Sequence, residues 1–271
     1  MTRQPSIQKQ RRGNTLTDRS FYRNGPDYRQ GQTVGFREVK RDFGLHAVKV
    51  GGWVTGKEQT AAANQFHDAL TDLMRILGGT PALISLRSTL SLHYGTGGQR
   101  GVAAHYTPAH RTLALAKNAG PGSIAHEWFH ALDHYLADKV FPNAREGQFA
   151  SMAWLQDAEP VNHPLADALI QCFRSILLDD SGEGTSELFK ASTAADRAMG
   201  QVYYSRPEEL AARAFEAFVQ DAPLTNHFLV KGTKASPEAK EGLYPAGKQR
   251  LAINGAFSRY FQLLGQALQA R

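Results

Sequence analysis

Two histidines and a glutamate in the segment His126-Glu127-Trp128-Phe129-His130 have the residue types and the spacing of a metal site. Residues four apart in a helix lie one above the other, so the two imidazoles can share one ion. Neutral imidazole is a good zinc ligand. Glu127, one step round the helix, could take a proton from a zinc-activated water and pass it to a leaving amine. The motif predicts zinc-dependent peptide hydrolysis, and a structural histidine pair is the alternative.

A catalytic zinc needs a third protein ligand. Asp133 and His134 lie further along the same helix without a turn, so neither can complete a tetrahedron. Asp133 is better placed to accept the N–H of a ligand imidazole, or it is an ordinary surface acid. A later helix that begins at Pro207 offers Glu209 and Glu216, which are seven residues apart and share a face. Either glutamate could meet the zinc, and both could instead be surface carboxylates.

The elements that would position these residues follow from hydrophobic spacing and breaker residues. Helices are predicted over residues 58–77, 124–138, 164–178, 207–220 and 249–268. Strands are predicted over residues 84–92, 102–106 and 112–117, and residues 34–53 read as mixed strand and turn. Ser123 is the expected N-cap of the helix that carries the motif. The fold class is therefore α+β, with a small mixed sheet, the HExxH helix and a mostly helical C-terminal half.

Charge and composition divide the chain into a leader and a body. Residues 1–30 hold seven Lys or Arg against two Asp, which is +5 of the net charge of +6. We expect a flexible basic leader over 1–33 and one catalytic domain over 34–271, with a mixed half at 34–140 and a helical half at 141–271. The leader could contact nucleic acid or an acidic partner, or it could simply be solvated. A protein or peptide is the expected substrate.

Cysteine content and hydropathy bear on the expected location. Cys172 is the only cysteine, which excludes an intrachain disulfide and a cysteine-based zinc site. No apolar run reaches the ~20 residues that span a bilayer. The basic N-terminus lacks the apolar stretch of a secretory signal. We therefore expect a cytoplasmic protein without a membrane partner.

The motif segments at 126–135 and 203–216 resemble the zincin superfamily in its glutamate-ligand branch. They are similar to the active-site motifs of anthrax lethal factor and the clostridial Pro-Pro endopeptidase. A longer resemblance runs from residue 21 to the C-terminus. It is to bacterial, phage and plasmid proteins of the CLCA_X family and the large polyvalent protein-associated domain. That resemblance is carried by stretches such as Gly52-Trp53-Val54, 104–106 and 122–127.

The resemblance implies a zincin-like fold and roles for individual residues. The zinc ligands are expected to be His126, His130 and Glu209, with Glu127 as the general base. The zincin tyrosine that stabilises the oxyanion precedes the ligand glutamate by seven residues, which is Val202 here. We therefore expect Tyr203, in preference to Tyr204, to take that role, and packing at a helix entry is its alternative.

Three further expectations complete the sequence-based interpretation. In zincins the strand before the active helix pairs with extended substrate, which points to residues 112–117. Arg206 and Arg213 could orient a substrate carbonyl or lie on the surface. The competing function is an inactive zincin-fold module of a mobile element that binds DNA or a protein partner.

Overall fold

A small mixed sheet and a set of helices make up the protein, as the predicted α+β class requires. The computed structural model describes residues 21–96, 103–117, 119 and 122–270. The strands are β1 (Val48–Val50), β2 (Ser91–Tyr94), β3 (Ala104–Thr107) and β4 (Thr112–Leu115). Their order in the sheet is β1-β2-β4-β3, and only β3 runs antiparallel to its neighbour. The antiparallel strand is therefore an edge strand, and β4 is an inner strand.

One face of the sheet is covered by helices and the other is more polar. The register aligns Leu92 with Leu113 and Tyr94 with Leu115, so these apolar side chains share a face. Tyr94 is fully buried there and packs on Phe36. The opposite face carries the residues that alternate with these along the strands, namely Lys49, His93, Ala114 and His105, which the register aligns with one another.

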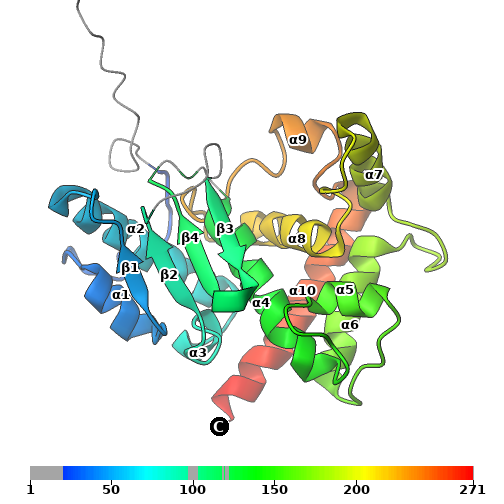
Figure 1. The fold of residues 1–271 in the computed structure, drawn as a ribbon, viewed down its shortest axis with the longest axis horizontal. Coiled ribbons are helices and arrows are strands. Elements are labelled where there is room, and N and C mark those ends of the chain that lie inside the picture. The colour runs from blue at the N-terminus through cyan, green and yellow to red at the C-terminus, as the bar shows by residue number, and fades with distance from the viewer. Residues whose placement is uncertain (1–20, 97–102, 118, 120–121, 271) are drawn as a thin grey trace, which may run out of the picture.

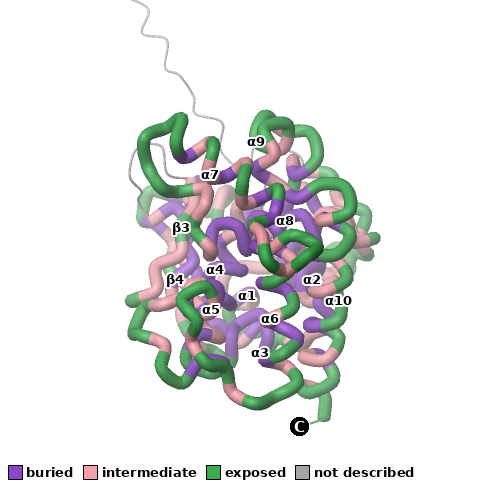
Figure 2. Tube along the Cα trace, turned by 90° about the vertical axis from the view of Figure 1, so that its right-hand side faces the viewer, coloured by how far each residue is buried: buried purple, intermediate pink, exposed green. Residues whose placement is uncertain are grey.

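The described residues form ten α-helices beside the sheet, and α4 lies between the sheet and the C-terminal helices (Figure 1). The first four are α1 (Phe36–Phe43), α2 (Gly56–Ile76), α3 (Pro81–Ile84) and α4 (Ser123–Val140). The C-terminal six are α5 (Ala150–Leu155), α6 (Pro164–Leu177), α7 (Glu187–Met199), α8 (Pro207–Asp221), α9 (Pro237–Lys240) and α10 (Gly247–Gln269). Figure 2 shows α4 and α8 as largely buried elements. The two helices that carry the motif residues therefore pack at the centre of the molecule.

Aromatic side chains hold α4, α8 and α10 together. Phe215 of α8 stacks on Phe129 of α4, with ring centroids 4.8 Å apart. Phe257 and Phe261 of α10 pack on the same phenylalanine, and all four rings are buried. Each such ring removes a large apolar area from water, so the relative position of α4 and α8 is fixed by the core.

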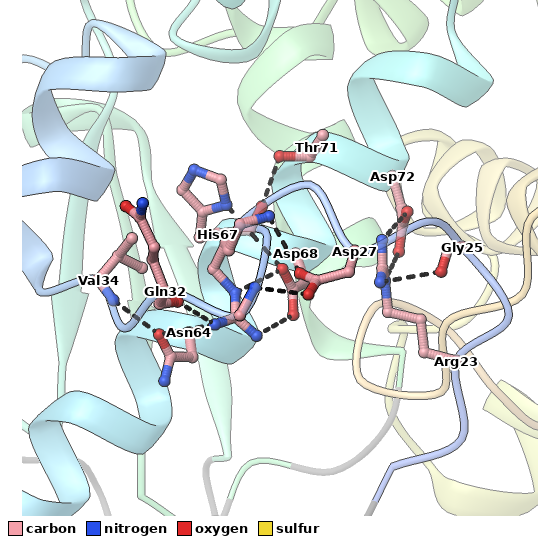
Figure 3. Close-up of polar contacts among 12 residues, drawn as sticks. Arg23, Gly25, Asp27, Gln32, Val34, Asn64, His67, Asp68, Thr71 and Asp72 are labelled. Carbon is pink, nitrogen blue, oxygen red and sulfur yellow. Dashed lines mark hydrogen bonds and ion pairs between the residues drawn. The ribbon is translucent and has the colours of Figure 1, made fainter.

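Two ion-paired arginines attach the N-terminal segment to α2, and Figure 3 labels one of these pairs, Arg23 with Asp72. Arg23 donates to both oxygens of Asp72 at 2.6 and 2.9 Å, and Asp72 is fully buried. Arg29 makes the same two-point contact with Asp68 at 2.9 and 3.0 Å. These two basic residues of the expected leader are thus neutralised by specific carboxylates. The other five lie at positions 3 to 19, outside the described residues, and nucleic-acid contact through them stays a prediction.

A second ion-pair cluster ties α10 to the end of α8. Arg250 donates to the two oxygens of Asp221 at 2.7 and 3.0 Å. Lys234 and Asn254 contact the same carboxylate at 2.7 and 2.8 Å. Burial opposes the charged form, but these hydrogen bonds hold the pKa of Asp221 well below its usual value.

The sequence-based prediction was wrong for several elements. Residues 84–90 do not form a strand: α3 occupies 81–84, and Leu86, Arg87 and Ser88 have positive φ angles. Residues 36–43, predicted as strand and turn, are the helix α1. The helices α5, α7 and α9 were not predicted. No helix in the described part of the chain has the length and apolarity needed to cross a bilayer.

Candidate metal centre

The helix that carries the motif begins at a glycine that no other residue could easily replace. Ser123 is the first helical residue, and Gly122 is the N-cap with φ 90°, so the predicted N-cap was one residue late. A Cβ on Gly122 would lie 2.8 Å from Glu216 Oε2. Positive φ and this close approach both favour glycine. The start of α4 is therefore built against a carboxylate of α8.

Three side chains, two from α4 and one from α8, bring possible ligand atoms together. The Nε2 atoms of His126 and His130 are 3.0 Å apart. Glu209 Oε2 lies 3.3 Å from Nε2 of His126, and Glu209 Oε1 lies 3.4 Å from Nε2 of His130. These are the three residues expected as ligands, and among the described residues they form the one group of this kind. The group could hold a metal ion.

The distance from each Nε2 atom to the Glu209 oxygen it faces is close to the spacing of two ligands around a tetrahedral ion. Metal–ligand bonds of about 2.0–2.1 Å place the ligands of a tetrahedron about 3.3–3.4 Å apart. Two imidazole nitrogens that face each other make a favourable contact only when a proton or a cation lies between them. Glu209 Oε2 is buried and has no hydrogen-bond partner among the described residues. A cation at the centre of the group would satisfy all three side chains.

Carboxylates around the imidazoles make the group favourable for positive charge. Burial lowers the pKa of His126, but the neighbouring carboxylates of Glu209 and Glu216 outweigh it and raise this pKa to about 10. Burial likewise opposes ionisation of Glu209, yet the two histidines hold its pKa far below the usual value. The negative potential that retains a proton on the imidazole would also attract a divalent cation, with release of that proton on binding.

Glu216 lies behind the group and orients one of its imidazoles. Its Oε1 atom is 2.6 Å from Nδ1 of His126, and its Oε2 atom accepts from the Tyr244 hydroxyl at 3.1 Å. A carboxylate on Nδ1 fixes the tautomer that leaves Nε2 free to bind a metal. The structure thus separates the two glutamates that shared a face in the sequence: Glu209 meets the ligand atoms and Glu216 supports one of them.

Asp133 and His134 lie outside the ligand group and contact other residues. Asp133 is buried and accepts from the N–H and the hydroxyl of Ser151, at 2.9 and 2.5 Å. The acceptor role expected for Asp133 therefore belongs to Glu216, because the start of α5 uses the Asp133 oxygens. His134 Nδ1 lies 2.8 Å from the Tyr106 hydroxyl.

Glu127 lies beside the ligand group, toward the edge of the sheet. Its side chain is 8% exposed, and burial raises its pKa, against the lowering effect of His126, His130 and the Tyr106 N–H. A raised pKa suits a carboxylate that must accept and then release a proton. The sequence predicts that Glu127 lies beside the metal site, and the structure shows that it also lies next to strand β3.

The edge strand next to this glutamate is β3, which corrects the expectation for residues 112–117. β4 has neighbours on both sides and no free edge. Directly before β3, the carbonyl of Ala103 accepts from Ala116 N–H, directly after β4, at 2.8 Å. Hydrogen-bonded and non-bonded pairs alternate along an antiparallel ladder, so Ala104 and Tyr106 point their backbone groups away from β4.

Of the two tyrosines, Tyr203 is the one whose pKa is affected by the ligand group. Burial raises the pKa of its phenol first, followed by the nearby Glu209 carboxylate, with a smaller effect of Glu127. The residue is 40% exposed, so it borders solvent. Tyr204 packs instead under Arg213. Val202, the residue at the position of the zincin tyrosine, is 65% exposed.

The two arginines near α8 differ from each other. Arg206 is exposed and is the N-cap residue of α8. Arg213 is only 4% exposed, and its guanidinium donates to the Tyr204 carbonyl and the Ser192 hydroxyl. Arg213 is therefore neither a surface charge nor free to bind a substrate carbonyl.

Comparison with known families supports part of this interpretation. Residues 195–268 match the family model of large polyvalent protein-associated domain 1, which points to a protein associated with mobile elements. The matched range contains Glu209, Glu216 and Tyr203, and it excludes α4 with both histidines. No curated protein and no solved structure matches the chain.

Proposed function

We propose that the protein is a zinc-dependent peptidase. The observation that carries the proposal is the convergence of two imidazoles and one carboxylate: the Nε2 atoms of His126 and His130 are 3.0 Å apart, and each lies within 3.4 Å of a different oxygen of Glu209. Two imidazoles and one carboxylate are a donor set that zinc enzymes use, with the fourth position open. A zinc ion held there would supply Lewis acidity and would lower the pKa of a water molecule to about 7.

Glu127 is the proposed general base and acid. It neighbours both ligand histidines on α4, and its burial keeps it ready to gain a proton. In the proposed reaction, its carboxylate accepts a proton from the attacking water. It then delivers that proton to the amine that leaves when the peptide C–N bond breaks. Proton transfer by a positioned side chain contributes about 10²–10⁴-fold to rate.

Tyr203 is the proposed hydrogen-bond donor to the substrate. The residue borders solvent, and the nearby Glu209 carboxylate raises the pKa of its phenol, so the hydroxyl is available to donate to a bound carbonyl oxygen. As negative charge develops on that oxygen, the phenol would donate to it. The raised pKa keeps the phenol protonated and therefore able to donate.

Among the described strands β3 is an edge strand, and its outer edge is the proposed binding site for the peptide backbone. Ala104 and Tyr106 direct their N–H and C=O groups away from β4, and β3 packs beside α4. An extended peptide that adds as a strand would pass alongside Glu127. This arrangement favours a protein segment in extended conformation over a compact small molecule.

The test is metal analysis followed by a cleavage screen. Purified protein should contain about one zinc per chain, and Glu209→Ala should remove it. A peptide-library screen with the zinc form should give cleavage that Glu127→Gln abolishes while zinc is retained. Protein without stoichiometric metal would refute the proposal at its first step. Retained metal without any cleavage would favour the non-catalytic module instead.

A further inference from the structure

The segment that carries Tyr203 is held by a single buried carboxylate. Asp196, on α7, accepts from the backbone N–H groups of Tyr203, Tyr204 and Ser205 at 3.1, 2.8 and 2.9 Å. The Ser205 hydroxyl donates to it as well, at 2.5 Å. Asp196 is 5% exposed. Three successive N–H groups that converge on one carboxylate leave the segment little freedom to rotate.

Arg213 fixes the same segment from the other side. Its guanidinium donates to the carbonyl of Tyr204 and lies 5.0 Å from the centre of the Tyr204 ring. Its Nε atom is buried without a hydrogen-bond partner among the described residues. Burying a guanidinium that is not fully hydrogen-bonded costs free energy. The position of Arg213 one turn after Glu209 on α8 links this segment to the metal ligand.

Capping of α7 does not explain the Asp196 carboxylate. The C-cap is Gly200 in a left-handed conformation, and its N–H already donates to the carbonyls of Asp196 and Arg197. Gln201 N–H donates to the Asp196 carbonyl as well. The end of α7 is therefore closed by backbone groups alone. The Asp196 side chain acts on the residues that follow.

We propose that Asp196, with Arg213, is a positioning residue that holds the Tyr203 hydroxyl at the His126–His130–Glu209 group. The proposal rests on the proposed function, because it assigns the tyrosine as donor to the substrate. The physical reason is that a donor misplaced by about 1 Å can cost about 10²-fold in rate. The tyrosine side chain is partly exposed and lies on a segment outside regular secondary structure, so its own packing does not supply that precision.

The first experiment reports the position of Tyr203 without any metal or substrate. Fluorotyrosine is incorporated at position 203 of the full chain and followed by fluorine NMR in the metal-free protein. Asp196→Ala should narrow the resonance and move it toward that of a solvent-exposed tyrosine, and Asp196→Asn should do so in part. An unchanged resonance in a folded Asp196→Ala protein would overturn the proposal.

A matched control exists elsewhere in the chain. Asp179 accepts from the N–H groups of Ser181, Gly182 and Gly184 and from the Ser181 hydroxyl, so it holds a different loop in a similar way. Asp179→Ala should leave the fluorine resonance of residue 203 unchanged. A change as large as that from Asp196→Ala would mean that the signal reports general loosening, and would overturn the proposal.

The second experiment adds Co²⁺ as a paramagnetic probe. In the wild-type chain Co²⁺ should shift and broaden the resonance of residue 203 relative to Zn²⁺, and Asp196→Ala should lose most of this effect while Co²⁺ affinity is retained. If wild-type protein binds neither ion, the proposed function fails, and the metal-free experiment still decides the positioning role. An equal Co²⁺ effect in Asp196→Ala would overturn that role.

The third experiment uses a substrate found in the cleavage screen. If Asp196 acts through the tyrosine, Asp196→Ala should lower kcat with little change in KM, by at most the loss from Tyr203→Phe, which is about 10²–10³-fold. In the Tyr203→Phe background the Asp196 change should have no further effect. Additive losses would refute action through Tyr203.

Discussion

Replacement of Glu216 by glutamine tests whether this carboxylate orients the proposed ligand His126 or binds the metal itself. The carboxylate is 4% exposed and lies 2.6 Å from His126 Nδ1. Glutamine keeps the size of the side chain and can accept the same hydrogen bond, but it has no charge. Hydrogen bonds to charged groups contribute about 1.5–3 kcal/mol and neutral ones about 0.5–1.5 kcal/mol. The difference of about 1–1.5 kcal/mol corresponds to about a tenfold weaker metal affinity.

Two further variants and one control give reference values for the expected change in zinc affinity. Glu216→Ala removes the hydrogen bond completely and should weaken zinc binding by about 100-fold, the upper end of the range for outer-shell partners. Glu209→Gln removes a direct ligand and should weaken it further than either Glu216 variant. Glu159→Gln, at an exposed position, should leave the affinity unchanged.

The assay is competition for Zn²⁺ against a chromophoric chelator, with circular dichroism to confirm that each variant is folded. The expected order of dissociation constants is wild type, Glu216→Gln, Glu216→Ala and then Glu209→Gln. A larger loss for Glu216→Gln than for Glu209→Gln would move the ligand two turns along α8. Unchanged affinity in Glu216→Ala would refute the supporting role.

Three other predictions concern catalysis and stability. Glu127→Gln should keep stoichiometric zinc and lose at least about 10²-fold in peptide turnover; unchanged turnover would remove the general base. Tyr203→Phe should lower kcat by about 10²–10³-fold at nearly constant KM, and a change confined to KM would assign the phenol to binding alone. Burial opposes ionisation of Asp221, but the hydrogen bonds from Arg250 outweigh burial and lower the pKa of Asp221 in the folded state. The stabilisation that this carboxylate provides is therefore present above its unfolded pKa of about 3.9 and is lost as pH falls. Urea titrations should therefore show that Asp221→Asn destabilises the protein at neutral pH and flattens the fall in stability toward acid, unlike the exposed-site variant Asp180→Asn.

The helices of the site could be predicted because their signals are local. The predicted 124–138 and 207–220 became Ser123–Val140 and Pro207–Asp221. Apolar residues at helical spacing, and a proline at the first turn of α8, need no knowledge of the rest of the fold. The same holds for the predicted 58–77 and 249–268, which became Gly56–Ile76 and Gly247–Gln269.

Elements whose signals are short or ambiguous could not be predicted in this way. Alternating leucines at 84–92 resemble a strand, but Pro81 begins a helix and three successive residues then take positive φ. In α1 the Glu38 carboxylate accepts from Gly35 N–H, and Val39 and Phe43 are buried one turn apart. Eight residues with several charges give too weak a periodicity to reveal that helix.

At the site, the residue types indicated which side chains could bind a metal. The separate roles of the two glutamates became apparent only from the three-dimensional structure. Spacing by seven puts Glu209 and Glu216 on one face of α8, and only the crossing with α4 decides which one reaches both Nε2 atoms. The roles of Asp196 and Tyr244 had no sequence signal at all. Asp196 binds backbone N–H groups, which every residue except proline carries. Tyr244 comes from a loop 28 residues after its partner, Glu216.

Charged residues of α8 lie in the core of the protein and also form part of the proposed site. Its residues from Glu208 to Val219 are all buried, including Glu209, Arg213 and Glu216. Apolar replacements for buried charges of this kind are often neutral or stabilising, so packing alone gives no reason for four of them, Glu208 included, on one central helix. Three of the four have a specific task in the structure: one carboxylate meets the imidazoles, one orients an imidazole, and the guanidinium holds the tyrosine segment. The same burial that makes these charges costly also lowers the local dielectric, which would strengthen their interaction with a bound cation and with negative charge that develops in the proposed reaction. The rigid aromatic packing of Phe215 against α4 and α10 then keeps α8 in place while it bears that cost.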